Sequence, residues 1–191
     1  LQVNSNKPAE WMSENNLRFQ AYTSMAFGAE NIIWACYTAG WWHNQVLDGE
    51  GNKTEQYDKL KKINAEIRTL ADEYMKYRRV STHFVGFEGH PHMAAVKQEA
   101  IPSLSTGVFF DVKADYGAPL VVGEMVNRNA DGSVALMVCA ADDPHETDPK
   151  EYNITFRAPD RCVRALGGDG YKTVTDLGGG VYAVAVKSNE G

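Results

Sequence analysis

The hydrophobic pattern changes along the chain, from a helical period before about residue 80 to a strand period after it. Apolar residues recur at helical spacing from about Glu14 to Phe27, and Ser13 is a suitable N-cap for this stretch. A second apolar stripe, with intervals of 3, 4, 3, 4 and 3 residues, runs from Leu60 to Tyr77. The pattern therefore predicts two amphipathic helices, the second of which begins after Thr54.

One short apolar run lies between the two predicted helices, and another precedes the first helix. The stretch Asn31–Thr38 is nearly continuous in apolar residues but too short for a helix, which favours a strand buried on both faces, as in a parallel sheet. Leu1–Asn4 is strand-like as well. Strand, helix, strand, helix is typical of a parallel sheet, but a complete barrel takes about 250 residues. We therefore expect these units to expose apolar faces unless something covers them.

The second part of the chain alternates between apolar and polar residues in short runs separated by turns rich in Gly, Asn and Asp. This pattern predicts a β-sandwich, with an irregular connection over residues 86–104. The predicted fold class is therefore α+β, with one domain over residues 1–79 and a sandwich over residues 80–191. Strands are expected near residues 80–85, 107–113, 120–127, 134–140, 151–158, 162–166, 171–175 and 181–187.

Composition narrows the function classes. The net charge is −6, without the basic face of a nucleic-acid binder, and no apolar run approaches the roughly 18 residues of a membrane span. Three cysteines at scattered spacings give neither a disulfide framework nor a zinc site. We expect them to be small buried hydrophobes, with a Cys139–Cys162 bridge between neighbouring strands as the alternative.

Several stretches of the first part occur in a familiar order. They are Leu17-Arg18-Phe19-Gln20-Ala21-Tyr22, Ala26-Phe27-Gly28-Ala29, Tyr37 to Trp42, Asp48 to Tyr57 and Lys62-Ile63-Asn64-Ala65-Glu66-Ile67. In this order they resemble the end of clan-A glycoside hydrolases, especially family-42-like β-galactosidases. The resemblance identifies helix 7, strand 8 and helix 8 of a (β/α)8 barrel, covers residues 1–79, and extends to the sandwich only in position and type.

The resemblance implies a retaining hydrolase of β-glycosides, with two carboxyl groups about 5 Å apart. The acid/base would lie upstream of Leu1, so we expect the native polypeptide to have been trimmed or to start earlier. No glutamate ends Leu1–Asn4, the counterpart of strand 7, and the nearest are Glu10 and Glu14. Glu14 is better explained as an acid beside a helix N-terminus, so the catalytic residues stay unassigned.

Residues at the ends of the two strands are the substrate-binding candidates. Trp41 and Trp42 follow strand 8 and offer flat faces to a sugar ring; we expect one to be a platform and one a core residue. Tyr37 would point into the barrel. His43 would bind a hydroxyl or lie at the surface, and Asn4 is a weaker polar candidate. Neither a cofactor nor a metal is expected, because His90, His92 and the stretch 142–148 lack metal-ligand spacing.

Two functions follow. The first is the C-terminal part of a glycoside hydrolase that is inactive alone, with a carbohydrate substrate and the missing N-terminal barrel segment as partners. The resemblance alone favours a secreted or periplasmic location. The second is a non-catalytic carbohydrate-binding or structural sandwich module, for which Phe109, Tyr116 and Tyr171 are the candidate aromatics.

Overall fold

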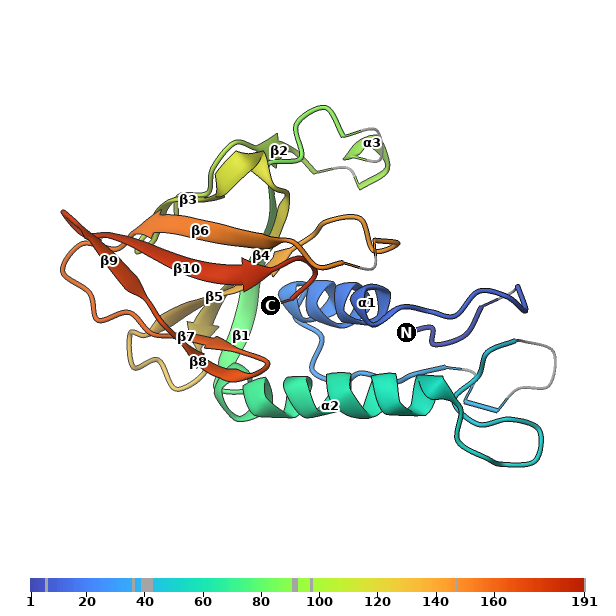
Figure 1. Ribbon diagram of the computed structural model, residues 1–191. Helices are drawn as coiled ribbons and strands as arrows, with labels where there is room; N and C mark the ends of the chain where they lie inside the picture. Colours follow the sequence, from blue (N-terminus) through green and yellow to red (C-terminus); the bar gives the residue numbers. More distant parts are fainter. Residues whose placement is uncertain are drawn as a thin grey trace.

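The protein has an α+β fold in which two helices lie on one side of a pair of mainly antiparallel sheets (Figure 1). A computed structural model describes residues 1–5, 7–35, 37–38, 43–90, 93–96, 98–146 and 148–190. Within these residues no helix is both long and apolar enough to cross a membrane.

Both predicted helices are present, and each starts at its predicted cap. Helix α1 spans Glu14–Ala26, and the Ser13 hydroxyl accepts a hydrogen bond from the Asn16 N–H. Helix α2 spans Glu55–Tyr74, and the Thr54 hydroxyl accepts from the Gln56 N–H. Helix α2 ends before the predicted Tyr77, because Tyr77 already pairs with Asn127 in a sheet.

The strands of the second part form two four-stranded sheets and one hairpin. The first sheet has the order β2-β1-β4-β5, the second has the order β3-β6-β10-β9, and β7 and β8 form the hairpin. The strand bounds are β1 Tyr77–Val85, β2 Ala100–Ile101, β3 Phe110–Ala114, β4 Leu120–Asn127, β5 Val134–Ala140, β6 Glu151–Arg157, β7 Ala165–Gly167, β8 Gly170–Lys172, β9 Thr175–Gly178 and β10 Val181–Lys187.

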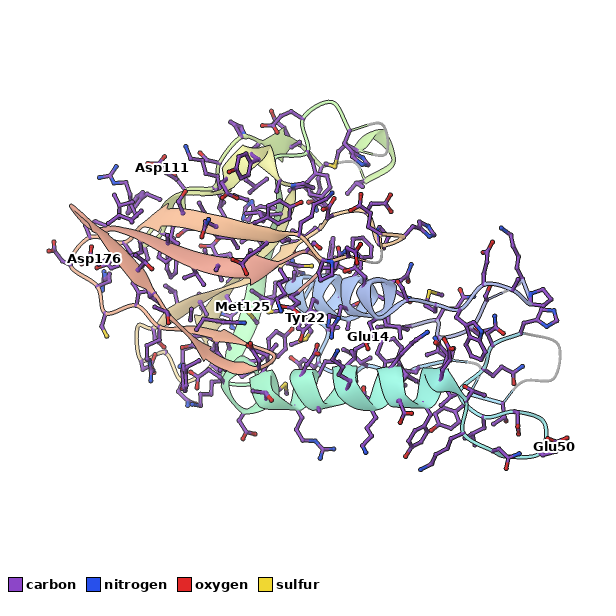
Figure 2. All side chains as sticks on the ribbon, viewed as in Figure 1. Glu14, Tyr22, Glu50, Asp111, Met125 and Asp176 are labelled. Carbon is purple, nitrogen blue, oxygen red and sulfur yellow. The ribbon has the colours of Figure 1, made fainter. Side chains whose placement is uncertain are left out.

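Alternate side chains of these strands point to opposite faces of a sheet. One set fills the space between the two sheets, and the other fills the space under the helices. Leu120 and Val122 of β4 face the second sheet, where they meet Ile154 and Phe156 of β6. The opposite face of β4 carries Val121 and Met125, which pack against α1. Tyr22 of α1 and Met125 belong to this second cluster and point into the layer between helix and sheet (Figure 2). One sheet therefore contributes to two cores.

Several sequence predictions need correction. Residues 86–104, predicted to be irregular, contain the short helix α3 (Met93–Val96) and strand β2. The strand predicted from residue 107 starts at Phe110, because the Thr106 hydroxyl accepts from the N–H groups of Val108 and Phe109 and forms a turn there. Cys139 is buried as predicted, whereas Cys162 is exposed; both are free thiols. Cys36 lies outside the described residues.

The largest correction concerns Asn31–Thr38, which is not a strand buried on both faces. A single parallel bridge joins Ala35 to Gln2, and residues 31, 33, 35, 37 and 38 are exposed. The physical reason is the lack of a second partner: within the described chain the segment packs on the helices through one face alone. The (β/α) units of a barrel are therefore not formed as regular elements here.

Candidate functional site

Two extended segments lie side by side in parallel next to the helices. The N–H of Ala35 donates to the carbonyl oxygen of Leu1 at 2.7 Å, and the Leu1 ammonium donates to the Ile33 carbonyl at 2.6 Å. Gln20 of α1 holds Gln2 through two hydrogen bonds, of 2.9 and 3.0 Å. These contacts fix the parallel register of the first segment against the second and against α1.

Side chains of the second segment alternate between a covered and an uncovered side. Ile32 and Trp34 pack against the helical layer, and the Trp34 indole N–H donates to Asn64 Oδ1 at 2.9 Å. Ile33 is 78% exposed and Tyr37 is 44% exposed. An isoleucine of an extended segment at this exposure leaves apolar area in water that a neighbouring layer would ordinarily cover.

Asn4 ends the first segment in an enclosed polar setting. Its side chain is fully buried, yet neither amide atom has a hydrogen-bond partner among the described residues. The neighbouring Gln56 is also fully buried; its amide donates to the Val3 carbonyl at 2.7 Å, while its Oε1 has no partner there. Because an unsatisfied buried amide costs about 1–3 kcal/mol, both groups are placed to receive a further polar partner.

His43 lies beside the end of the first segment. Its backbone exchanges hydrogen bonds with Ser5, of 3.2 and 3.3 Å, and its ring is exposed. The following Asn44 donates from its amide to the carbonyl oxygens of Lys7, Pro8 and Glu10. His43 is therefore paired with Ser5, the residue that follows Asn4 in the sequence. Tyr37 is also described, but Trp41 and Trp42 lie outside the described residues.

The two glutamates considered for catalysis are both in ion pairs. Glu10 is exposed and pairs with Lys7 at 2.8 Å. Glu14 pairs with Lys62 at 2.7 Å and Arg18 at 3.1 Å. Burial raises the pKa of Glu14, but hydrogen bonds and charges from Lys62 and Arg18 outweigh it, so that its pKa is below its ordinary value. Glu14 therefore stays ionised and acts as a structural acid at the start of α1.

A second enclosed polar group joins the helices and was not predicted from the sequence. Arg18 donates to both oxygens of Glu66, and the Tyr22 hydroxyl lies 3.5 Å from Glu66 Oε2. The Glu66 hydrogen bonds hold the pKa of Arg18 above its ordinary value, and burial raises the pKa of Tyr22. The sequence does contain a signal for this group: Arg18 and Glu66 are polar residues that each lie on an otherwise apolar face of a helix.

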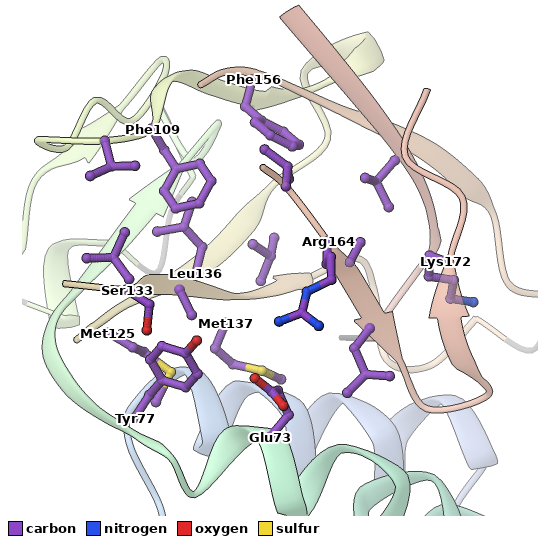
Figure 3. A pocket seen from close by; sticks show the side chains of 18 of the residues that line it. Glu73, Tyr77, Phe109, Met125, Ser133, Leu136, Met137, Phe156, Arg164 and Lys172 are labelled. Atoms are coloured by element: carbon purple, nitrogen blue, oxygen red, sulfur yellow. The ribbon is translucent and has the colours of Figure 1, made fainter. Parts of the chain in front are cut away.

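The sandwich contains a cavity of about 570 Å³. It extends from the space between the sheets, at Phe109 and Phe156, past β5 to the end of α2 at Leu70 and the start of β1 at Tyr77 (Figure 3). Arg164 points into it in the same view. Sequence reasoning missed this cavity, which lies apart from the N-terminal segments.

The remaining sequence candidates give no further site. His90 is described, whereas His92 lies outside the described residues. Within the described part of the chain, no group of three His, Cys, Asp or Glu residues is placed to hold a metal ion. The stretch 142–146 instead anchors to α1, where Asn15 donates to the carbonyl oxygens of Asp143 and Glu146.

Comparison with known proteins leaves the geometry as the only guide to function. No protein-family model, no curated protein and no solved structure matches the chain.

Proposed function

We propose that this chain is the C-terminal part of a retaining glycoside hydrolase that acts on β-glycosides, with a β-galactosidase-like site. In this proposal the N-terminal residues supply the last two units of a (β/α)8 barrel, and the sandwich is an accessory domain. One observation carries it: two parallel segments joined at Gln2 and Ala35 have one face on helices and the other, with Ile33 and Tyr37, in solvent. That arrangement is expected where further parallel strands belong.

The end of the segments agrees with a sugar-binding role. In a barrel the ligand contacts residues at the C-terminal ends of the strands. Asn4 stands at such an end, with an unpaired amide donor and acceptor; because it is fully buried here, it would reach a sugar hydroxyl only where the rest of the barrel opens this end. Tyr37 and His43 provide an exposed ring each. Trp41 and Trp42 follow in sequence, and we propose them as the stacking platform.

The catalytic carboxylates are assigned to another part of the polypeptide. Retaining hydrolysis needs two carboxyl groups about 5–5.5 Å apart, one to attack the anomeric carbon and one to exchange a proton with the leaving oxygen. Glu10 and Glu14 are held by cationic side chains, and Asn4 has an amide in place of an acid. This chain alone would therefore bind sugar weakly and cleave nothing.

A non-catalytic glycan-binding module is the second candidate. It is favoured by two aromatic side chains on the sandwich, Tyr116 and Tyr171, which are 95% and 67% exposed. The first lies in the short turn after β3, outside the sheets, and the second lies on β8 of the hairpin. A module of this kind would bind oligosaccharides without any upstream segment, and Tyr116→Ala or Tyr171→Ala would abolish that binding.

Hydrolysis of 4-nitrophenyl β-D-galactoside tests the main proposal. The assay compares residues 1–191 with the polypeptide of the natural reading frame that includes any upstream sequence. We expect turnover by the longer polypeptide alone, with the β-anomer of galactose released first by proton NMR. Trp41→Ala and Trp42→Ala would raise KM, with Tyr116→Ala as the matched control. Turnover by residues 1–191, first release of the α-anomer, or an inactive longer polypeptide would contradict the proposal.

A further inference from the structure

Strand β5 is the outer strand of the first sheet, and one of its edges is unpaired. The N–H of Asn127 donates to the carbonyl oxygen of Ser133 at 3.1 Å, which makes every second residue from 133 onward a hydrogen-bonded partner of β4. Val134, Leu136 and Val138 therefore direct their N–H and C=O groups away from β4. Within the described chain no backbone partner reaches these three residues.

At Ala140, the last residue of β5, the outward N–H and C=O groups of the same edge do have backbone partners. The N–H of Ala140, the next residue in the series, donates to the carbonyl oxygen of Glu190 at 3.4 Å. The Ala140 carbonyl in turn accepts from the N–H of Asn189 at 2.5 Å. The turn that follows β10 thus meets this edge at Ala140, and within the described chain no backbone group bonds to the edge further along, at Val138, Leu136 or Val134.

The 570 Å³ cavity runs along this unpaired edge. Its lining includes every residue from Gly132 to Val138 on one wall and every residue from Asp160 to Gly167 on the opposite wall. Met125 and Met137 border it on the helix side, and Phe109 and Phe156 on the side between the sheets. The space is therefore a slot between an edge strand and a second extended segment, with apolar surfaces above and below.

The charges around the slot favour an acidic ligand. Arg164 and Arg161 line it and have no ion pair among the described residues. The other lining cation, Lys172, is paired with Asp169 at 2.6 Å. Of the lining acids, Glu73 is paired with Lys76 at 2.6 Å, and Asp160 has no ion pair in the described chain. Figure 3 shows the Arg164 guanidinium directed into the cavity, on the same side of it as Met137 and Glu73.

The unpaired backbone distinguishes between classes of ligand. A hydrocarbon chain in the slot would remove water from the peptide groups of Val134, Leu136 and Val138 without replacing its hydrogen bonds, which is unfavourable. An extended peptide supplies an N–H and a C=O at the matching repeat, and its alternate side chains reach the apolar surfaces. A carboxylate on that peptide would pair with Arg164.

We propose that the slot between β5 and residues 160–167 binds an extended segment of another polypeptide by β-strand addition, with apolar side chains at alternate positions and an acidic residue opposite Arg164. This site is independent of the glycosidase proposal, since none of its residues belongs to the N-terminal segments. It fits the general behaviour of unpaired sheet edges, which accept a further strand unless they are covered.

The test uses residues 1–191 and a capped probe, acetyl-Val-Glu-Val-Thr-Val-amide, with amide exchange followed by NMR. We expect saturating probe to slow exchange at Leu136 and Val138 at least tenfold. A probe N-methylated at alternate residues should bind at least tenfold more weakly, because it cannot pair with the edge. Arg164→Glu should weaken binding at least tenfold, and replacement of the probe's Glu by Lys should restore it. Arg68→Glu, on the exposed face of α2, is the matched control and should change nothing.

Four results would overturn the inference. The first is no protection of the edge amides by the probe. The second is equal binding of the N-methylated probe, which would remove strand addition as the mode. The third is protection of the same amides by laurate but not by the peptide, which would make the slot a lipid-like pocket. The fourth is concentration-dependent protection without any probe, which would make β5 a contact between copies of this chain.

Discussion

Arg18 of α1 holds Glu66 of α2 in a two-pronged ion pair, with Nε–Oε2 and Nη2–Oε1 distances of 2.8 and 2.7 Å. The two side chains are only 10% and 17% exposed. Buried charges are tolerated when they are paired and hydrogen-bonded on both sides, as they are here. This pair therefore fixes how the two helices sit on each other beneath the N-terminal segments.

Removal of one partner of the Arg18–Glu66 pair should lower the free energy of unfolding. Glu66→Gln leaves the buried Arg18 cation with Glu14, at 3.1 Å, as its remaining counter-charge and without its two-pronged partner, so we expect a loss of about 2 kcal/mol in the free energy of unfolding, measured by urea denaturation. Lys76→Ala breaks an exposed pair with Glu73 and should leave the free energy of unfolding nearly unchanged, because water screens that pair. Equal effects of the two variants would show that the Arg18 pair is as solvated as a surface one.

Gly123 of β4 is where α1 meets the sheet. A Cβ at this position would overlap the carbonyl oxygen of Ala26 and lie 3.1 Å from its Cα. Both are backbone atoms that cannot rotate away, so Gly123→Ala should cost about 2 kcal/mol or more. Thermal unfolding would measure the loss, with Gly107→Ala as control, because nothing lies within 4 Å of its added Cβ. An unchanged melting temperature for Gly123→Ala would mean that α1 sits further from the sheet.

Asn15 fastens a sandwich loop to the start of α1. Its buried amide donates to the carbonyl oxygens of Asp143 at 3.3 Å and Glu146 at 2.8 Å. In Asn15→Ala the loop loses both bonds, and we expect faster proteolytic cleavage within residues 142–149 together with a stability loss of about 1–2 kcal/mol. Asn129→Ala, at an exposed turn, serves as the comparison. A loop that stays equally resistant in Asn15→Ala would be held by other contacts.

The ionisation of Asp142 makes the stability of the fold depend on pH in the acid range. Burial raises the pKa of Asp142, but hydrogen bonds from Tyr152, the Asp143 N–H and Lys150 outweigh it and lower the pKa below 3.8. An acid whose pKa is lower in the folded state adds stability above its unfolded pKa and loses it as the pH falls through the folded pKa. Urea denaturation at about pH 6 and about pH 2.5 should show a smaller acid loss for Asp142→Asn than for the wild type. Asp72→Asn, on the exposed face of α2, should retain the full loss.

Local chemistry made the helices and most strands predictable from the sequence. Ser13 and Thr54 accept the expected cap hydrogen bonds, and Gly28 has the positive φ of +87° that a helix end favours. The alternation in Tyr152, Ile154 and Phe156 correctly predicted a strand with one buried face. In each case the signal and the structure lie within a few residues of each other.

The missed features depend on residues far apart in the chain. Arg18 and Glu66 are 48 positions apart, and no periodicity specifies that they meet. The apolar run from Asn31 indicates a strand but not whether a neighbour covers its second face. The slot beside β5 exists because β5 is an outer strand, and alternation is the same for outer and inner strands. Sheet order, which decides this, follows from packing of the whole chain.

Hydroxyl-radical footprinting of residues 1–191 tests most directly the claim that the N-terminal segments form an uncovered part of a larger sheet. We expect oxidation of both Ile33 and Tyr37, with Tyr37 reacting more slowly than Tyr116 but far faster than the buried Tyr22, which stays unmodified. Protection of Ile33 and Tyr37 to the level of Tyr22 would contradict it, because this chain would then enclose the segment by itself.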